Sequence, residues 1–143
     1  MDEADPFQLQ RFVDAQEGVF DTALPELQEG RKQSHWIWFI FPQLAELGRS
    51  PTSQFYGIRS LQEARAYLAH PLLGNRYRQC VEAVEAWTGK RNAAEIFGEL
   101  DAMKLRSSLT LFEVASGDPL LAETLHAFFE GPDEATLRIL KRS

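Results

Sequence analysis

The sequence predicts an all-α protein: a compact bundle of about six to eight helices around a buried aromatic segment, in one domain spanning residues 1–143. Apolar residues recur every three or four positions along most of the chain. Glycines close most of these segments, and no two stretches read as strand partners. Residues that favour helix N-caps precede the segments, at Asp5, Ser60, Asn92, Asp101, Asp118 and Asp133.

The N-terminal segment is helical by its apolar spacing. Asp5 followed by Pro6 is typical of a helix start, with proline at the first helical position. Gly18 and Pro25 both weaken a continuous helix, so the segment that closes at Gly30 is either one kinked helix or two short ones.

The most apolar stretch runs from Trp36 to Phe41 and holds two of the three tryptophans. Six consecutive apolar residues are expected to be buried on nearly every side. The β-branched and aromatic content favours a strand. Ser34 as an N-cap and Pro42 as a stop favour a helix of about two turns. We expect the helix, because no other segment offers a strand partner.

The remaining elements follow the same signals. Residues 44–48 read as a short helical turn, and residues 49–59 as the longest loop. The later helices are expected at 61–69, from 71 to 88, from 92 to about 97, from 101 to 116, from 118 to 130 and from 133 to 140.

Composition excludes several classes of protein. The net charge of −6 and the pI near 5.1 argue against binding to a nucleic-acid polymer, which requires a basic face. The longest apolar run is far shorter than the roughly 20 residues of a membrane span. The single cysteine, Cys80, excludes an internal disulfide, and the three dispersed histidines predict no metal site. Glycine-rich nucleotide motifs are absent, so no cofactor is predicted, and we expect a cytoplasmic protein.

The helix expected from Asp101 carries the most informative polar residues. Asp101, Lys104 and Ser108 stand at i, i+3 and i+7 and therefore share one helix face, with Ser107 beside them. A lysine next to an aspartate and a serine can hold a phosphate or activate a hydroxyl. The alternative is an N-cap with an exposed ion pair, which contributes only about 0.3 kcal/mol.

A second group of candidates surrounds the aromatic stretch. Lys32 and His35 precede it, and His35 has the pKa range of a general acid or base, although a histidine beside a core segment is more often structural. Trp36, Trp38 and Tyr56 offer ring faces on which a planar ligand can stack, but most of the aromatic set must belong to the core, so at most one tryptophan is expected to face a ligand. The amide of Gln43 is expected to form hydrogen bonds either with unpaired backbone groups at a helix end or with the polar edge of a ligand.

Two further residues complete the candidate site. Arg76 lies just inside the helix that begins near Pro71, where a guanidinium can hold an anion. His70, before that proline, is expected to cap the helix. Glu63 is a candidate carboxylate for acid or base chemistry.

From about Phe12 to Leu140 the chain carries a set of short motifs: Ala15-Gln16, Gly30-x-Lys32, His35-Trp36-x-Trp38-Phe39-x-Phe41-Pro42-Gln43, Gly48-x-Ser50, Tyr56-x-Ile58, Glu63-Ala64-x-x-Tyr67-Leu68-x-His70-Pro71, Leu73-Gly74-x-Arg76, Asp101-x-x-Lys104-Leu105-x-Ser107-Ser108-x-Thr110-Leu111-Phe112 and Gly131-x-Asp133-x-x-Thr136. In this set the chain resembles a small bacterial family known as domain of unknown function 1810, some of whose members carry the label "calpastatin". The resemblance implies an all-α fold and supplies no established activity. Calpain inhibitors of that name are disordered, which does not suit a chain so rich in aromatic residues and helix caps.

A weaker resemblance links the chain to the NADAR proteins, which act on ADP-ribose linkages. It involves Glu63-Ala64, Gly74 with Arg76, and the helix around Met103 to Phe112. The Glu-His-Tyr segment that carries the NADAR catalytic glutamate has no counterpart here.

Two functions follow as hypotheses. In the first, the polar candidates form a pocket for an anionic, nucleotide-like ligand such as ADP-ribose; in its stronger form the protein hydrolyses a glycosidic bond, with Glu63 or Asp101 as the carboxylate and His35 as an acid or base. In the second, the protein is a non-enzymatic helical domain whose surface serves another protein. The sequence predicts no oligomeric state.

Overall fold

The computed structural model describes residues 5–142, and their regular structure is almost entirely helical. A 3₁₀-helix, Ala45–Leu47, lies between α3 and α4, and a single isolated bridge joins Leu44 to Ile58; residues 5–142 contain no sheet. The all-α fold is therefore confirmed. The α-helices of the described residues are α1 (Gln10–Gln16), α2 (Phe20–Gln28), α3 (Ile37–Ile40), α4 (Pro51–Phe55), α5 (Leu61–Ala69), α6 (Leu73–Glu85), α7 (Ala93–Phe97), α8 (Glu99–Ser116), α9 (Pro119–Phe128) and α10 (Glu134–Lys141).

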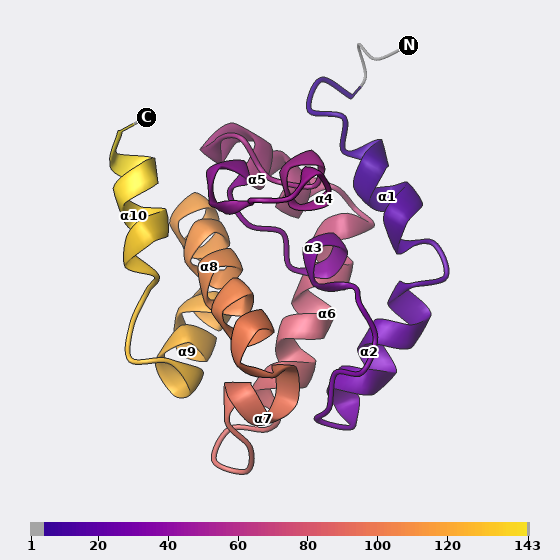
Figure 1. The fold of residues 1–143 in the computed structure, drawn as a ribbon, viewed down its shortest axis with the longest axis vertical. Coiled ribbons are helices and arrows are strands. Elements are labelled where there is room, and N and C mark those ends of the chain that lie inside the picture. Colours follow the sequence, from indigo (N-terminus) through magenta and orange to yellow (C-terminus); the bar gives the residue numbers. More distant parts are fainter. Residues whose placement is uncertain (1–4, 143) are drawn as a thin grey trace.

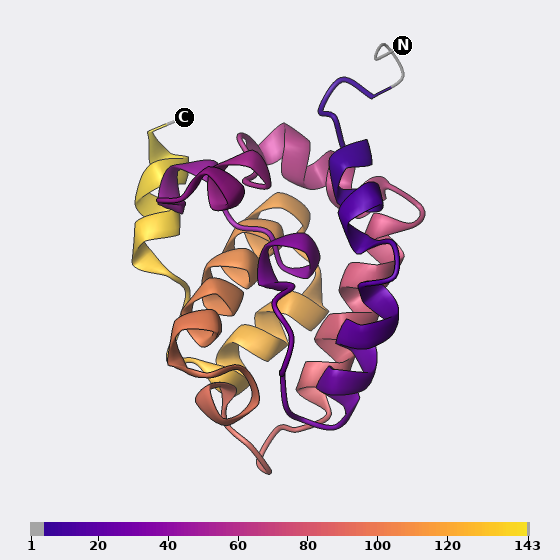
Figure 2. The ribbon, with the colours of Figure 1, turned by 45° about the vertical axis from the view of Figure 1, so that its right-hand side comes forward.

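These ten helices exceed the expected six to eight, because the N-terminal segment divides into α1 and α2 and because α4 forms where a loop was expected. The longest helix, α8, runs through the middle of the molecule and packs against α5, α7, α9 and α10 (Figure 1). Helix α2 lies along α6, and α3 is placed in front, where it contacts both α6 and α8 (Figure 2).

Most of the predicted helix starts are confirmed by their hydrogen bonds. Ser60, Asn92, Asp118 and Asp133 each accept a backbone N–H from the first turn of the helix that follows. The prediction for Asp101 is wrong: α8 already begins at Glu99, so Asp101 lies inside its first turn and its carboxylate is free to meet other groups.

In the first sixty residues the structure selects between two open alternatives for the N-terminal segment and corrects two predictions, the helix start at Asp5 and the loop at 49–59. The N-terminal segment forms two helices, α1 and α2, separated at Gly18, whose φ of +77° ends the first helix. Asp5 accepts N–H groups of Leu9 and Gln10, but the helix starts only at Gln10. Within the expected loop 49–59 the chain forms α4. Ser50 at the N-cap and Ser53 at the third helical position make a reciprocal capping box, and Pro51 occupies the first helical position.

The aromatic stretch is a single helical turn, shorter than the two turns expected. Trp36, Ile37, Ile40 and Phe41 are buried, whereas Trp38 and Phe39 are only half-buried. The expectation of burial on nearly every side was therefore wrong for those two residues, because a one-turn helix near the surface points its other side outward.

Beneath α3, four aromatic rings join the helices at the centre of the molecule. Phe41 packs edge-on against Tyr77 with ring centroids 5.5 Å apart, and Tyr77 and Tyr67 both contact Phe112. These rings come from the α3 end, α5, α6 and α8, so one cluster ties together the elements that carry the candidate site.

Candidate functional site

Three charged residues of the candidate set meet at the start of α8. Asp101 and Lys104 stand one turn apart on that helix, while Lys32 comes from the loop after α2. The backbone N–H of Lys32 donates to the carbonyl of Ile96 at 2.7 Å, which holds this loop against α7. We call Lys32, Asp101 and Lys104 the lysine–aspartate cluster.

The two lysines share the aspartate through its two oxygens. Lys32 Nζ lies 2.7 Å from Asp101 Oδ2, and Lys104 Nζ donates to Oδ1 at 3.2 Å. Lys32 also donates to the carbonyl of Ser34 at 2.6 Å, and its side chain is only 6% exposed. Lys104 is 27% exposed, so it is the member of the cluster that solvent or a ligand can reach.

The lysines keep Asp101 ionised. Partial burial raises the pKa of Asp101, but the hydrogen bonds and charges of Lys32 and Lys104 lower it further, to a net value below the ordinary one. At neutral pH the group is therefore a carboxylate, suited to holding cations and unsuited to donating a proton.

Each lysine also lies over a tryptophan ring. Lys32 Nζ is 5.0 Å from the centroid of Trp36, and Lys104 Nζ is 5.0 Å from the centroid of Trp38. The indole N–H of Trp36 donates to Glu26, but Trp38 Nε1 is buried without a hydrogen-bond partner in the part of the chain that the structure describes. A buried donor left unsatisfied is costly, so Trp38 Nε1 marks a position where an acceptor would stabilise the molecule.

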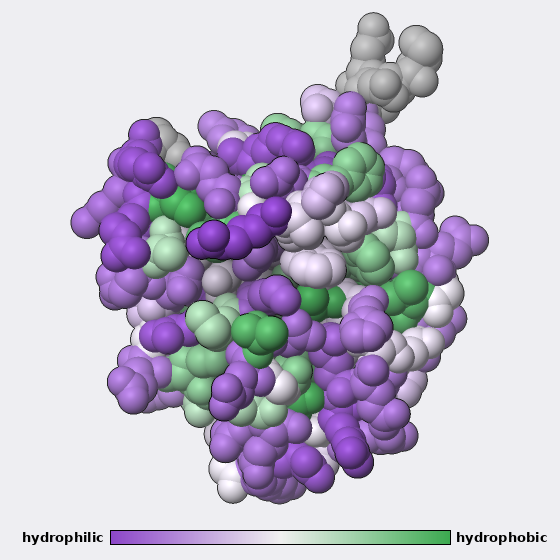
Figure 3. All heavy atoms as spheres, in the orientation of Figure 1, coloured by the Kyte–Doolittle hydropathy of each residue, from purple (hydrophilic) through white to green (hydrophobic). Residues whose placement is uncertain are grey.

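Two exposed apolar side chains lie on the same turns of α8 as Asp101 and Lys104. Leu100 is 75% exposed and Met103 is 66% exposed, and both stand next in sequence to a charged member of the cluster. Figure 3 shows green surface among purple toward the α7 end of α8. The surroundings of Lys104 therefore combine a cation, an indole and apolar surface.

The serines of α8 do not join the cluster. Ser108 is fully buried, and its Oγ is 2.9 Å from the hydroxyl of Tyr77. Ser107 donates to Met103 O and to Asp133 Oδ2, and thereby helps dock α10 onto α8. The two serines lie on the core-facing side of α8, so these side chains serve packing.

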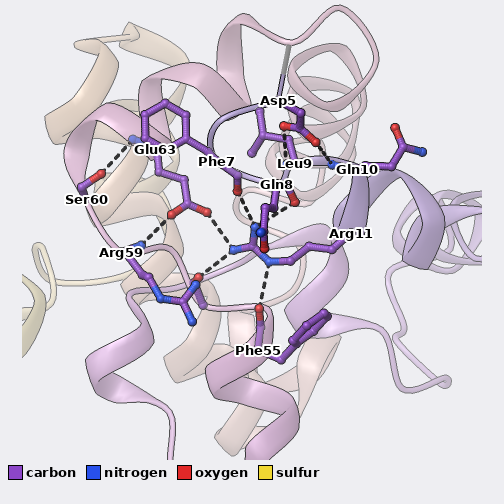
Figure 4. A network of polar contacts seen from close by, with 11 residues as sticks. Asp5, Phe7, Gln8, Leu9, Gln10, Arg11, Phe55, Arg59, Ser60 and Glu63 are labelled. Carbon is purple, nitrogen blue, oxygen red and sulfur yellow. Dashed lines mark hydrogen bonds and ion pairs between the residues drawn. The ribbon is translucent and has the colours of Figure 1, made fainter. Parts of the chain in front are cut away.

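Glu63 lies in a different part of the molecule. Its Oε2 accepts from Arg11 at 2.7 Å, its Oε1 accepts the N–H of Arg59, and the carboxylate and guanidinium are both nearly buried (Figure 4). Arg11 also donates to the carbonyls of Phe55 and Gly57 and to carbonyls of its own helix start. Both oxygens of Glu63 are thus occupied by a tie between α1 and the start of α5.

Arg76 is separate again, and it belongs to a buried polar chain. It donates to Gln16 Oε1 at 3.2 Å and lies over the ring of Phe20. Gln16 Nε2 in turn donates to the carbonyl of Phe39 and to the hydroxyl of Tyr67. This chain anchors the C-terminal end of α3 to α1, α5 and α6.

The other candidates are dispersed. His35 is exposed on the loop before α3, and Gln43 is buried, with its backbone carbonyl accepting from Ile58. Tyr56 packs edge-on against Phe39 with centroids 4.8 Å apart. The expected cap at His70 is confirmed, since its Nδ1 accepts the N–H groups of Leu72 and Leu73.

Glu26 positions the loop that carries Lys32, and sequence reasoning missed it. It accepts hydrogen bonds from the backbone N–H groups of Gln33 and Ser34, from Ser34 Oγ and from Trp36 Nε1. Burial raises the pKa of Glu26, but these hydrogen bonds lower it to about 2. Ser34 is not the N-cap of α3, as the sequence had suggested, because the helix begins at Ile37 with Trp36 at the N-cap position. A glutamate on a helix surface offers no local signal of such a role.

Five surface hollows of the described residues have volumes of about 220 to 490 Å³. Three of them border α10, and the other two lie around the loop that follows α6. None of these five is lined by a member of the lysine–aspartate cluster, so that site is a surface patch. Within residues 5–142, no group of three His, Cys, Asp or Glu side chains is placed to hold a metal ion, and no helix is long and apolar enough to cross a membrane.

The fold and the site define an all-helical protein whose most exposed site lysine is held by an aspartate above a tryptophan. The chain belongs to the family described as "Protein of unknown function (DUF1810)", whose sequence model matches residues 6–140. It is similar to the conserved hypothetical protein Rv1873 from Mycobacterium tuberculosis, with 45% identity and a TM-score of 0.93 over 96% of this chain and 99% of that chain. No curated protein matches the chain, and the resemblance to NADAR proteins finds no support in these comparisons.

Proposed function

We propose that this protein is a cytoplasmic binding protein for a small anionic ligand with a planar group, of the nucleotide-like class that includes ADP-ribose. The ligand would be held at the lysine–aspartate cluster and Trp38. The observation that carries the proposal is the buried indole N–H of Trp38, which has no partner within the described residues and whose ring lies beneath the partly exposed ammonium of Lys104. An anion beside Lys104 would match the cation, and it would also satisfy the indole once the atoms that cover Trp38 Nε1 move aside on binding.

The roles of the three charged residues differ in this proposal. Lys104 contacts the ligand, because it is the most exposed of the three. Its ammonium has three N–H donors, and the hydrogen bond to Asp101 uses one of them. Asp101 fixes the direction of the Lys104 side chain. Lys32 is a positioning residue, since its ammonium is already engaged by Asp101 and Ser34.

The exposed apolar side chains near Lys104 indicate that the ligand carries a planar apolar group as well as an anion. Leu100 stands four residues before Lys104 on α8 and so shares its helix face, Met103 follows one turn after Leu100, and most of the surface of both is exposed. A planar base or ring seated there would remove apolar surface from water, at about 25 cal/mol per Å². A phosphate alone would leave this surface uncovered.

The geometry supports binding more strongly than hydrolysis of a glycosidic bond. Asp101 is ionised and shared between two lysines, so it has no proton to give to a leaving group. Glu63 is engaged by Arg11 and by the N–H of Arg59. His35 is exposed and is the remaining candidate for proton transfer.

Titration calorimetry with ADP-ribose and with NAD tests the proposal. We expect binding to the parent protein and a loss of at least about tenfold in affinity for Lys104→Met, since a charge-assisted hydrogen bond contributes about 1.5–3 kcal/mol. Trp38→Phe, which keeps a ring and removes the N–H, should also weaken binding. Lys90→Met is the matched control, because Lys90 is an exposed lysine outside the cluster. Release of a free sugar would be followed in the same samples.

If the parent protein binds neither ADP-ribose nor NAD, the proposal that it binds a nucleotide-like ligand is wrong. The competing function, a non-enzymatic interaction domain, is favoured by the same exposed Leu100 and Met103, which a protein partner can cover. It would be preferred if Lys104→Met lowered the melting temperature and left all ligand titrations unchanged.

A further inference from the structure

We propose that the surface around α10 binds a short acidic peptide segment of another protein, with one apolar side chain of that segment seated in a hollow beside the helix. This surface is formed by Leu61, Val114, Leu137, Arg138, Leu140 and Lys141. It lies apart from the lysine–aspartate cluster, and the proposal does not depend on the function proposed above.

The hollow has the walls that an apolar anchor requires. It measures about 340 Å³ and is bounded by Leu61 at the start of α5, Val114 near the end of α8, and Leu137 and Leu140 of α10. Val114 is 39% exposed although it lies among apolar neighbours. Figure 3 shows hydrophobic surface enclosed by hydrophilic surface next to α10. Filling such a recess with an apolar side chain removes both surfaces from water.

The rim of the hollow is basic, which sets the charge of the partner. Arg138 and Lys141 line this hollow and also a neighbouring one of about 490 Å³, where Arg142 joins them. Arg142 pairs with Glu46, while Arg138 and Lys141 make no ion pair with the residues from 5 to 142. Glu134 is the one acidic residue at the edge of the apolar hollow.

This concentration of positive charge contrasts with a chain whose net charge is −6. Cations in the last turn of a helix are favourable to its dipole, which accounts for their place on α10. The dipole does not account for an open apolar recess directly beneath them. A peptide with carboxylates beside an apolar residue matches both features.

A peptide fits this surface better than an anionic membrane does. A helix that inserts into a lipid surface presents protruding apolar side chains, whereas Leu137 and Leu140 are half-buried against the protein. A third hollow, about 280 Å³, shares Leu140 with this one and is also lined by Leu44, Ile58 and Ile139, so it continues the track for an extended chain.

The test uses three fluorescein-labelled synthetic peptides and fluorescence anisotropy. The first carries two leucines among glutamates, the second replaces the leucines by serine, and the third replaces the glutamates by lysine. We expect the full-length protein to bind the first peptide and to bind the other two at least about tenfold more weakly. Arg138→Glu with Lys141→Glu should reduce binding of the first peptide by about tenfold or more.

Lys90→Glu is the control, because Lys90 is also exposed and lines a different hollow. It should bind as the parent does. Far-ultraviolet dichroism would establish that all variants remain helical. Equal binding of the leucine and serine peptides, or no binding of the first peptide, would overturn the proposal. If the parent protein binds none of the peptides but sediments with phosphatidylserine vesicles, the proposal is also overturned, and the surface is then assigned to lipid binding.

Discussion

Glu26 acts on the site through four hydrogen bonds to the loop that carries Lys32. Its carboxylate collects two backbone N–H groups, a hydroxyl and the indole of Trp36, and so orders residues 33–36 ahead of α3. The ammonium of Lys32 then meets Asp101 with its side chain almost fully enclosed. Through Lys32 and Asp101, the position of Lys104 on α8 therefore depends on contacts that begin at Glu26 on α2.

The first prediction concerns the pH dependence of this arrangement. The pKa of Glu26 is about 2 in the folded protein against an ordinary 4.5, so between these values the folded chain holds fewer protons than the unfolded chain. The free energy of unfolding should therefore fall as pH drops through this window. Glu26→Gln should be less stable than the parent near neutral pH, and the difference should shrink as the pH approaches about 3.

Urea unfolding of both proteins at about pH 6 and about pH 3 measures this difference. A gap that stays constant over the range would contradict the assigned role of Glu26. Glu29→Gln is the control, because Glu29 is an exposed carboxylate at the end of the same helix.

At the scale of elements, four of the predicted N-caps are confirmed, and the errors at Asp5, Ser34 and Asp101 arise where packing moves the helix start. Ser60, Asn92, Asp118 and Asp133 begin helices because a cap needs only a partner two or three residues ahead. The true start of α8 at Glu99 depends on Gly98 and on the packing of α7, which no local pattern specifies.

In the candidate site, too, contacts between residues close in sequence were predictable and contacts between distant residues were not. Asp101 and Lys104 stand one turn apart, so their pairing follows from helical spacing. The inclusion of Lys32 depends on a loop from far earlier in the chain, held by the carbonyl of Ile96. Ser108 shares the helix spacing but faces Tyr77, because the register of α8 against α6 decides which side is buried.

The second prediction belongs to the tie between α1 and α5. Arg11→Met should lower the free energy of unfolding by about 3–5 kcal/mol, because it leaves Glu63 buried without its cation and four backbone carbonyls without a side-chain donor. Arg142→Met provides the comparison, since that arginine and its partner Glu46 are both largely exposed and their pair contributes about 0–1 kcal/mol. Urea unfolding measures both. Equal losses in the two variants would show that burial of the Arg11 pair has no energetic consequence.

For the molecule as a whole, the aromatic cluster connects elements that are distant in the sequence. Tyr67, Tyr77 and Phe112 come from α5, α6 and α8, and Phe41 brings the end of α3 into contact with Tyr77. Gly74 allows the close approach on which this depends, because a Cβ there would collide with the backbone carbonyl of Leu68. The hydrophobic pattern predicted that such a core exists, but it could not assign which aromatic residues face inward from a helix of one turn.

The third prediction separates the two faces of that turn. Phe41→Ala should cost about 3–5 kcal/mol, because Phe41 is fully buried and contacts Trp36, Tyr77 and Phe97. Trp38→Ala should cost less, about 1–2 kcal/mol, because its half-buried ring loses fewer contacts and its removal eliminates an unsatisfied donor. Thermal and urea unfolding would rank the variants, with Phe55→Ala as an exposed aromatic control. A larger loss for Trp38→Ala than for Phe41→Ala would mean that α3 is held mainly by its outer face. The indole of Trp38 would then serve to hold α3 in place, and the proposal that it binds a ligand would be wrong.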